Sequence, residues 1–233
     1  MLYIIVFIFG SILGSAIGAY IYRRKNLKSF LIGRSKCEIC GKKIPFYYNI
    51  PILSYIILKG KCKNCKNKIH VYIFMCEIIM AILTTILYIN YGFQFKFLLR
   101  LLELILLLII SVTDIREKAV YTIDIFALFS TEFFIKIYYG DVMLNSIKMM
   151  VLLGMIYFLI YYLSKAMGEA DVILGAVSGF FATNFYEVFK IFRNSFMVAA
   201  FVVILLVFLK NKGAKEKIAF CPYIAISILM VII

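Results

Sequence analysis

Long apolar stretches, separated by short polar segments, run along almost the whole chain. A stretch of about 20 apolar residues is long enough for an α-helix to cross the hydrocarbon core of a bilayer. One polar segment, residues 23–69, is longer than an ordinary connecting loop. The sequence predicts an all-α membrane protein, a polytopic bundle of about eight transmembrane helices. The predicted spans are 1–22, 70–91, 95–113, 119–139, 143–163, 171–189, 195–209 and 218–233.

The composition supports this class and excludes a large soluble domain. Hydrophobic residues make up 64% of the chain and charged residues 16%, with a mean hydropathy of +0.99, whereas a soluble domain is about 45–50% apolar. We divide the chain into a first transmembrane helix at 1–22, a polar loop at 23–69 and a membrane core at 70–233. The first helix is expected to be retained, because its basic residues follow the apolar stretch instead of preceding it as in a signal peptide.

The basic residues are distributed unevenly, and this predicts the topology. The chain has 26 Lys and Arg against 12 Asp and Glu, and half of these cations lie between Arg23 and Lys68. By the positive-inside rule, loop 23–69 is cytoplasmic. Strict alternation of the spans then places loops 114–118, 164–170 and 210–217 in the cytoplasm and both termini outside. Because topology accounts for the positive charge, we expect no nucleic-acid partner.

Four cysteines in this loop have the spacing C-x2-C-x21-C-x2-C, which is typical of a tetrahedral zinc site with two chelating pairs. The alternative is two disulfides or free thiols, but a cytoplasmic loop is reducing, which favours the metal. The surrounding cations also favour the thiolate form of the ligands. The loop is therefore predicted to be a small cytoplasmic zinc knuckle whose Zn²⁺ ligands are Cys37, Cys40, Cys62 and Cys65.

The two remaining cysteines, Cys76 and Cys221, lie in predicted helices outside this spacing. Free cysteine behaves as a small apolar side chain, so we expect both to be buried packing residues. We also find no internal repeat of 20–50 residues in the chain.

Carboxylates at membrane depth are costly and therefore point to function. Asp114 ends the third predicted span and Asp171 opens the sixth, so the predicted topology puts both at the cytoplasmic side. Two aspartates that meet across a bundle would share a proton, so that one acts on water as a base and the other as an acid. The alternative is that each is only a helix-terminal carboxylate. Further acids leave a candidate set rather than a unique pair, namely Glu77, Glu103, Asp124, Glu132 and Glu169.

Several motifs along the chain are similar to those of one known family. They are GSAIGAYIYRR at 14–24, RSKCEIC at 34–40, NIPILSY at 49–55, GKCKNC at 60–65, GEADVIL at 168–174 and IAFCPYI at 218–224. Together they resemble the type IV prepilin peptidases, bifunctional leader peptidases and N-methyltransferases of the GxGD aspartic class. The resemblance covers nearly the whole chain and is most specific in the cysteine-containing loop.

The resemblance implies an activity, partners and a location. Asp114 and Asp171 would be the catalytic pair, within a peptidase core at 70–233, that cleaves the cytoplasmic leader of a type IV prepilin or pseudopilin. Loop 23–69 would be the methyltransferase-associated region, with S-adenosylmethionine as the methyl donor, and its cations would contact anionic membrane lipids. The protein would be a multi-pass protein of the bacterial cytoplasmic membrane.

A second hypothesis comes from a different class of protein. The chain could be a non-enzymatic membrane protein whose zinc knuckle docks a cytoplasmic partner. In that case the acids would serve helix packing or ion passage, and both Asp114 and Asp171 would tolerate replacement by Asn.

Overall fold

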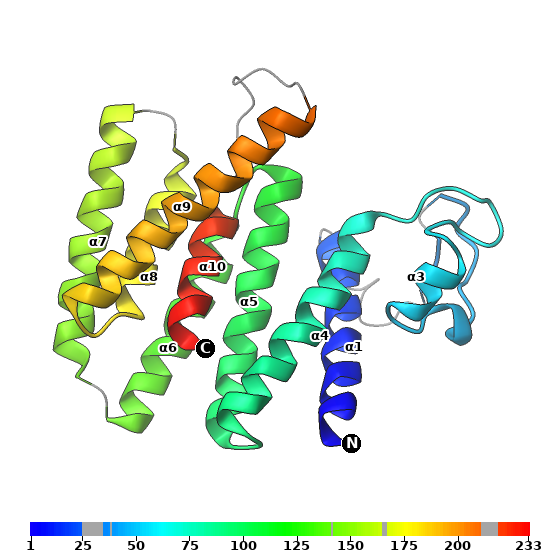
Figure 1. The fold of residues 1–233 in the computed structure, drawn as a ribbon, viewed down its shortest axis with the longest axis horizontal. Coiled ribbons are helices and arrows are strands. Elements are labelled where there is room, and N and C mark those ends of the chain that lie inside the picture. The colour runs from blue at the N-terminus through cyan, green and yellow to red at the C-terminus, as the bar shows by residue number, and fades with distance from the viewer. Residues whose placement is uncertain (25–34, 38, 141, 165–166, 211–218) are drawn as a thin grey trace. The chain divides into compact units, whose positions relative to one another are not determined.

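The computed structural model of the chain describes residues 1–24, 35–37, 39–140, 142–164, 167–210 and 219–233. These residues form helices and no named strand. They divide into two compact units, Met1–Phe97 and Leu98–Ile233, which are described separately below. The predicted all-α class is therefore confirmed for the described residues, and Figure 1 shows the order of the helices along the chain.

Six of the predicted spans correspond closely to observed helices. Each observed helix begins and ends within a few residues of the predicted limits. They are α1 (Leu2–Arg23), α4 (Val71–Tyr91), α5 (Phe95–Glu117), α6 (Thr122–Tyr139), α7 (Met143–Ser164) and α10 (Cys221–Ile232). Two short helices, η2 (Phe46–Tyr48) and α3 (Leu53–Ile57), lie in the polar loop.

The predicted span at 171–189 is wrong, and the one at 195–209 begins too late, because residues 195–209 lie inside a longer helix. The structure has α8 (Glu169–Phe180) and a longer α9 (Phe185–Lys210) in their place. The apolar run is broken at Asn184, whose Oδ1 accepts a hydrogen bond from the Glu187 amide at 2.9 Å, while the Glu187 carboxylate accepts one from the Thr183 amide at 2.7 Å. This reciprocal cap starts a new helix. Helix α8 has 12 residues, about 18 Å in length, which is too short to cross a core of about 30 Å.

Within the described residues, four helices are long and apolar enough to cross a membrane, namely α1, α4, α7 and the segment Phe185–Leu205 of α9. Helices α5 and α6 are long enough but carry several charged residues, and α10 is a shorter apolar helix of 12 residues. The observed helices therefore fit a membrane protein. They differ more in length and in charge than the eight similar spans that the sequence pattern predicts.

In the N-terminal unit, α1 packs closely against α4. A Cβ atom at Gly14 of α1 would lie 2.4 Å from the backbone oxygen of Cys76 in α4, so only glycine permits this approach. Gly10, one turn earlier, is similarly close to Met80. Small residues spaced by four are a common means of bringing two membrane helices together.

Buried Glu77 of α4 holds the polar loop against this helix pair. Its Oε2 accepts a hydrogen bond of 2.7 Å from the backbone amide of Ile52. Ile52 has a φ of 63°, a region that a β-branched residue rarely adopts. The carboxylate of Glu77 therefore stabilises a strained turn at the start of α3, which is a structural role for an acid that the sequence left among the catalytic candidates.

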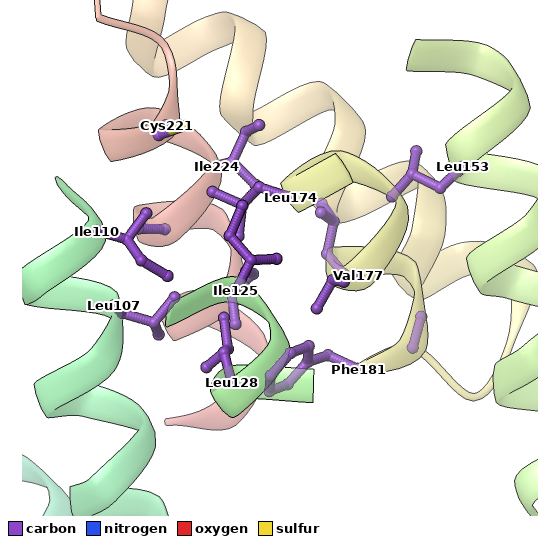
Figure 2. Packing of buried hydrophobic residues seen from close by; sticks show 14 of the residues in the cluster. Leu107, Ile110, Ile125, Leu128, Leu153, Leu174, Val177, Phe181, Cys221 and Ile224 are labelled. Atoms are coloured by element: carbon purple, nitrogen blue, oxygen red, sulfur yellow. The ribbon is translucent and has the colours of Figure 1, made fainter. Parts of the chain in front are cut away.

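In the C-terminal unit, α8 lies among α6, α7, α9 and α10. Leu174 and Val177 of α8 belong to one buried cluster with Ile125 of α6 and Ile224 of α10, and Figure 2 shows these side chains facing one another. On the side toward α7, a Cβ atom at Gly179 would lie 2.5 Å from the backbone oxygen of Met149. This short helix is thus fixed by neighbours on several sides, which places its first turn accurately.

A separate cluster of four charged side chains, three of them buried and Arg100 largely so, joins α5 to α6. Arg100 Nη1 contacts the carboxylates of Glu103 at 2.6 Å and Glu132 at 2.5 Å. Lys136 Nζ lies 3.3 Å from the other oxygen of Glu132. Two cations and two anions therefore balance in a region from which water is largely excluded.

Candidate functional site

Asp171 is placed by the start of α8. Gly168 is the residue that precedes the helix, and Asp171 is the third residue within it. The side chain turns back so that its Oδ2 accepts a hydrogen bond of 3.0 Å from the Gly168 amide. An acid at this position is favoured because it satisfies a free amide and faces the positive end of the helix dipole. The sequence GEAD thus fixes the position of this carboxylate locally.

The position of the Asp114 side chain depends on a helix other than the one that carries it. It lies in the last turn of α5, where the dipole of α5 disfavours a negative charge. Its Oδ2 accepts a hydrogen bond of 3.1 Å from the backbone amide of Cys221, the first residue of α10. The first amides of a helix have no partner within the helix. The N-terminus of α10 therefore compensates for the unfavourable position of Asp114 at the end of α5.

The two aspartates come together with Cys221 in one buried group. One ligand atom from each of the three residues lies within 4.8 Å of the other two. The aspartates are each 8% exposed and Cys221 is fully buried. The Cys221 thiol donates a hydrogen bond to Asp171 Oδ1 at 3.0 Å. Two carboxylates this close in a site with little water cannot both be ionised without a large cost, so the pair is suited to sharing one proton.

The other candidate acids lie apart from this group. Glu169 is exposed on the first turn of α8, although it is only two residues from Asp171. Asp124 is buried in the first turn of α6 but is not part of the group. Glu103 pairs with Arg100, as its i, i+3 spacing predicts.

Cys221 is the residue that sequence reasoning missed. It is buried, as predicted, but it hydrogen-bonds both aspartates and does more than fill space. Its position directly before Pro222 could have indicated this role. Proline is common in the first turn of a helix, so Pro222 marks a helix start, where backbone amides have no partner within the helix.

The four loop cysteines also come together, in the N-terminal unit. Their sulfur atoms lie within 4.8 Å of one another, and Cys37 Sγ is 3.7 Å from Cys65 Sγ. None of the six cysteines forms a disulfide. A tetrahedral ion with metal–sulfur bonds of about 2.3 Å would hold its sulfurs about 3.8 Å apart. The donor set and its spacing therefore fit a structural zinc ion, with Cys37, Cys40, Cys62 and Cys65 as the ligands.

Each cysteine pair is presented by a hairpin of the same geometry. The backbones of Lys36 and Lys43 form an antiparallel β-bridge in the first hairpin, and those of Lys61 and Lys68 form one in the second. The Cys37 amide donates to Lys42 O at 2.9 Å, and the Cys62 amide donates to Asn67 O at 2.8 Å. The underlying sequence, KCxxCxxKI, occurs twice. This short repeat, at 36–44 and 61–69, corrects the expectation that the chain has no internal repeat.

Backbone amides prepare this site for a metal. Hydrogen bonds from the Cys65 and Asn64 amides lower the pKa of the Cys62 thiol to about 7, against the opposing effect of its burial. The backbone amide of Cys40 lowers the pKa of Cys37, but burial and the neighbouring Cys62 and Cys40 thiols outweigh it and raise that pKa to about 11. Cys62 is therefore the thiol of this pair that more readily supplies the thiolate that binds zinc.

We expect purified protein to contain about one zinc ion per chain. Replacing Cys40 or Cys65 by Ser should lower the zinc content measured by elemental analysis and expose the loop to protease, while circular dichroism of the helices stays the same. Cys76→Ser is the matched control and should leave the zinc content unchanged. Full disulfide formation, or protein without metal after purification under reducing conditions, would contradict this assignment.

A cavity of about 290 Å³ lies beside the tetracysteine group. Its walls include the aromatic rings of Tyr47 and Tyr48 and the cations Lys36, Lys63 and Lys68. The methyl donor S-adenosylmethionine carries a sulfonium and an ammonium group, which need carboxylates or aromatic faces. The described lining residues include no carboxylate. The tyrosine rings could face the sulfonium, but three lysines and no described carboxylate leave the ammonium group without a counter-ion, so this lining does not fit the whole donor.

These features define a class: an α-helical membrane protein with a tetracysteine group that could hold a metal and a buried pair of aspartates. Residues 8–91 match the family model described as Bacterial Peptidase A24 N-terminal domain. This match runs from within α1 through the tetracysteine loop to the end of α4, and it supports the resemblance to the type IV prepilin peptidases. No curated protein and no solved structure matches the chain.

Proposed function

We propose that this protein is a membrane aspartic endopeptidase that cleaves the cytoplasmic leader of type IV prepilins or pseudopilins. One observation carries the proposal: the carboxylates of Asp114 and Asp171 lie together, buried, at the ends of two helices. The A24 domain at residues 8–91 supports the same activity. A single carboxylate at a helix end would have an ordinary structural explanation, but two in contact with the same third residue are costly without a function.

The chemistry follows from the pair. A water molecule between the carboxylates would lose a proton to the ionised aspartate while its oxygen attacks the scissile carbonyl carbon, and the protonated aspartate would protonate the carbonyl oxygen. Collapse of the tetrahedral species breaks the C–N bond: the departing nitrogen takes a proton from the first aspartate, and a hydroxyl of the tetrahedral species returns its proton to the second aspartate as the C=O bond re-forms. Each aspartate then regains its original state.

The substrate class follows from the predicted side of the membrane. A prepilin leader is cationic and cytoplasmic, while the segment after it is an apolar membrane helix, so the scissile bond lies near the membrane surface. The proposal therefore needs the tetracysteine loop and the aspartate pair to be on the cytoplasmic side. Cysteine-accessibility labelling at Lys63 and Lys118 should report cytoplasm for both, and a periplasmic signal at either would contradict the topology.

The direct experiment is to co-express the protein with candidate prepilins from its own genome and read the substrate N-termini by mass spectrometry. We expect the leader to be removed at the start of the apolar stem. The same spectra report whether the new N-terminus gains a methyl group, the second activity that the resemblance implies. Intact leaders on every candidate, with the protein folded and zinc-loaded, would favour the non-enzymatic docking hypothesis instead.

A further inference from the structure

Cys221 touches both members of the aspartate pair through two different donors. Its backbone amide donates to Asp114 Oδ2 at 3.1 Å, and its thiol donates to Asp171 Oδ1 at 3.0 Å. It is the first residue of α10, and Pro222 follows it. Because this one residue bridges the two carboxylates, the position of α10 sets the position of one aspartate relative to the other.

The donors around the pair are unequally divided. Both oxygens of Asp171 accept hydrogen bonds, Oδ1 from the Cys221 thiol and Oδ2 from the Gly168 amide. Asp114 accepts a hydrogen bond from the Cys221 amide at Oδ2 and is also in side-chain contact with the Cys221 thiol, so the donor that Asp171 has in addition is the Gly168 amide. An ionised carboxylate is an acceptor at both oxygens, whereas a protonated one must use one oxygen as a donor. The arrangement favours charge on Asp171 and leaves Asp114 Oδ1 as the oxygen that can carry a proton.

We propose that Cys221 is a positioning residue that assigns the roles within the pair, with Asp171 as the general base and Asp114 as the general acid. This inference rests on the proposed peptidase function. In the attack step, Asp171 takes the proton from water while Asp114 Oδ1 gives its proton to the carbonyl oxygen. Each carboxylate oxygen has two lone pairs, so the thiol and amide bonds to Asp171 leave room for the water.

A serine in place of Cys221 keeps a side-chain donor, whereas alanine removes it. We therefore expect Cys221→Ser to retain most activity. Cys221→Ala should lower kcat about tenfold, with little change in KM, because one hydrogen bond to a charged group is lost. The acidic limb of the pH–rate profile should also move to higher pH in Cys221→Ala, because Asp171 loses a donor that favours its charged form. The other titratable groups in electrostatic contact with the site, Lys118, Tyr157 and Tyr223, are the same in both variants.

Infrared spectroscopy tests the thiol contact without any substrate. Zinc-bound cysteines have no S–H bond, so in zinc-loaded protein only Cys76 and Cys221 contribute S–H stretching bands. In a Cys76→Ala background, the remaining band should lie at the lower frequency of a hydrogen-bonded thiol. It should shift upward in Asp171→Asn, whose acceptor is neutral, and stay in place in the control Glu169→Gln.

The two measurements separate failure of the inference from failure of the function. A band that does not respond to Asp171→Asn overturns the thiol contact, whether or not the protein is a peptidase. If the wild type cleaves prepilin and Cys221→Ala has the same kcat and pH profile, the role of Cys221 is overturned while the peptidase stands. If no prepilin is cleaved by the wild type, the acid and base assignment falls with the proposed function.

Discussion

Asp114→Asn and Asp171→Asn are each expected to abolish leader cleavage, lowering kcat/KM by at least about a thousandfold. A pair that divides the roles of base and acid loses nearly all of its rate when one carboxyl is removed. The two carboxylates lie within 4.8 Å of each other and each is 8% exposed, so no described acid outside the group can replace either. Cleavage of a co-expressed prepilin, followed by mass spectrometry, measures the effect.

Two neighbouring acids supply the controls. Glu169→Gln should retain activity, because Glu169 is exposed on the same turn of α8 that carries Asp171. Asp124→Asn should have a partial effect at most, since Asp124 is buried in α6 outside the aspartate group. Zinc content and thermal stability should match the wild type in all four variants. If Glu169→Gln were inactive while Asp114→Asn or Asp171→Asn still cleaved, the pair would be wrongly assigned.

The second large effect is expected from the charge cluster between α5 and α6. Replacing Arg100 by Met would leave Glu103 and Glu132 buried without their shared cation. Removing one partner of a buried ion pair costs about 3–5 kcal/mol, a large part of a typical folding free energy of about 5–15 kcal/mol. We therefore expect Arg100→Met to lose much of its folded population, measured as thermal unfolding in detergent.

Two comparisons make this expectation specific. Lys148→Met removes an exposed cation from α7 and should leave the unfolding temperature unchanged. The fourfold variant Arg100→Met, Glu103→Leu, Glu132→Leu and Lys136→Met should recover most of the stability, because a packed apolar cluster can replace a balanced buried one. An Arg100→Met protein as stable as the wild type would show that the cluster is not important for folding.

Features that depend on residues close together in the sequence could be predicted from the sequence. Hydrophobic runs gave the existence and approximate limits of most helices, because each long helix in a membrane protein must be apolar over its own length. The tetracysteine group was also predictable, since each pair of closely spaced cysteines is a local feature of the sequence. For the same reason the ion pair of Arg100 and Glu103, one turn apart on α5, followed from spacing alone.

The lengths of α8 and α9 were not predictable from hydrophobicity. The apolar run continues through both helices, and the break at 181–184 depends on a cap formed by Asn184 and Glu187. The residues Asn184 and Glu187 do not by themselves indicate a cap, because the same residues can also occur inside a helix. The consequence is that α8 is a short helix held by its neighbours and not a transmembrane span.

The sequence by itself determined a helical membrane protein with a tetracysteine site and a set of candidate carboxylates. Only the tertiary structure decided which of them meet. Asp114 is positioned by the first amide of α10, and Glu132 reaches Arg100 from α6. The physical reason is that periodicity along a helix records which face is buried, whereas the partner of a buried carboxylate depends on which distant helix end packs against it. Cys221 was hidden for the same reason, because its two donors acquire a role only when α5, α8 and α10 come together.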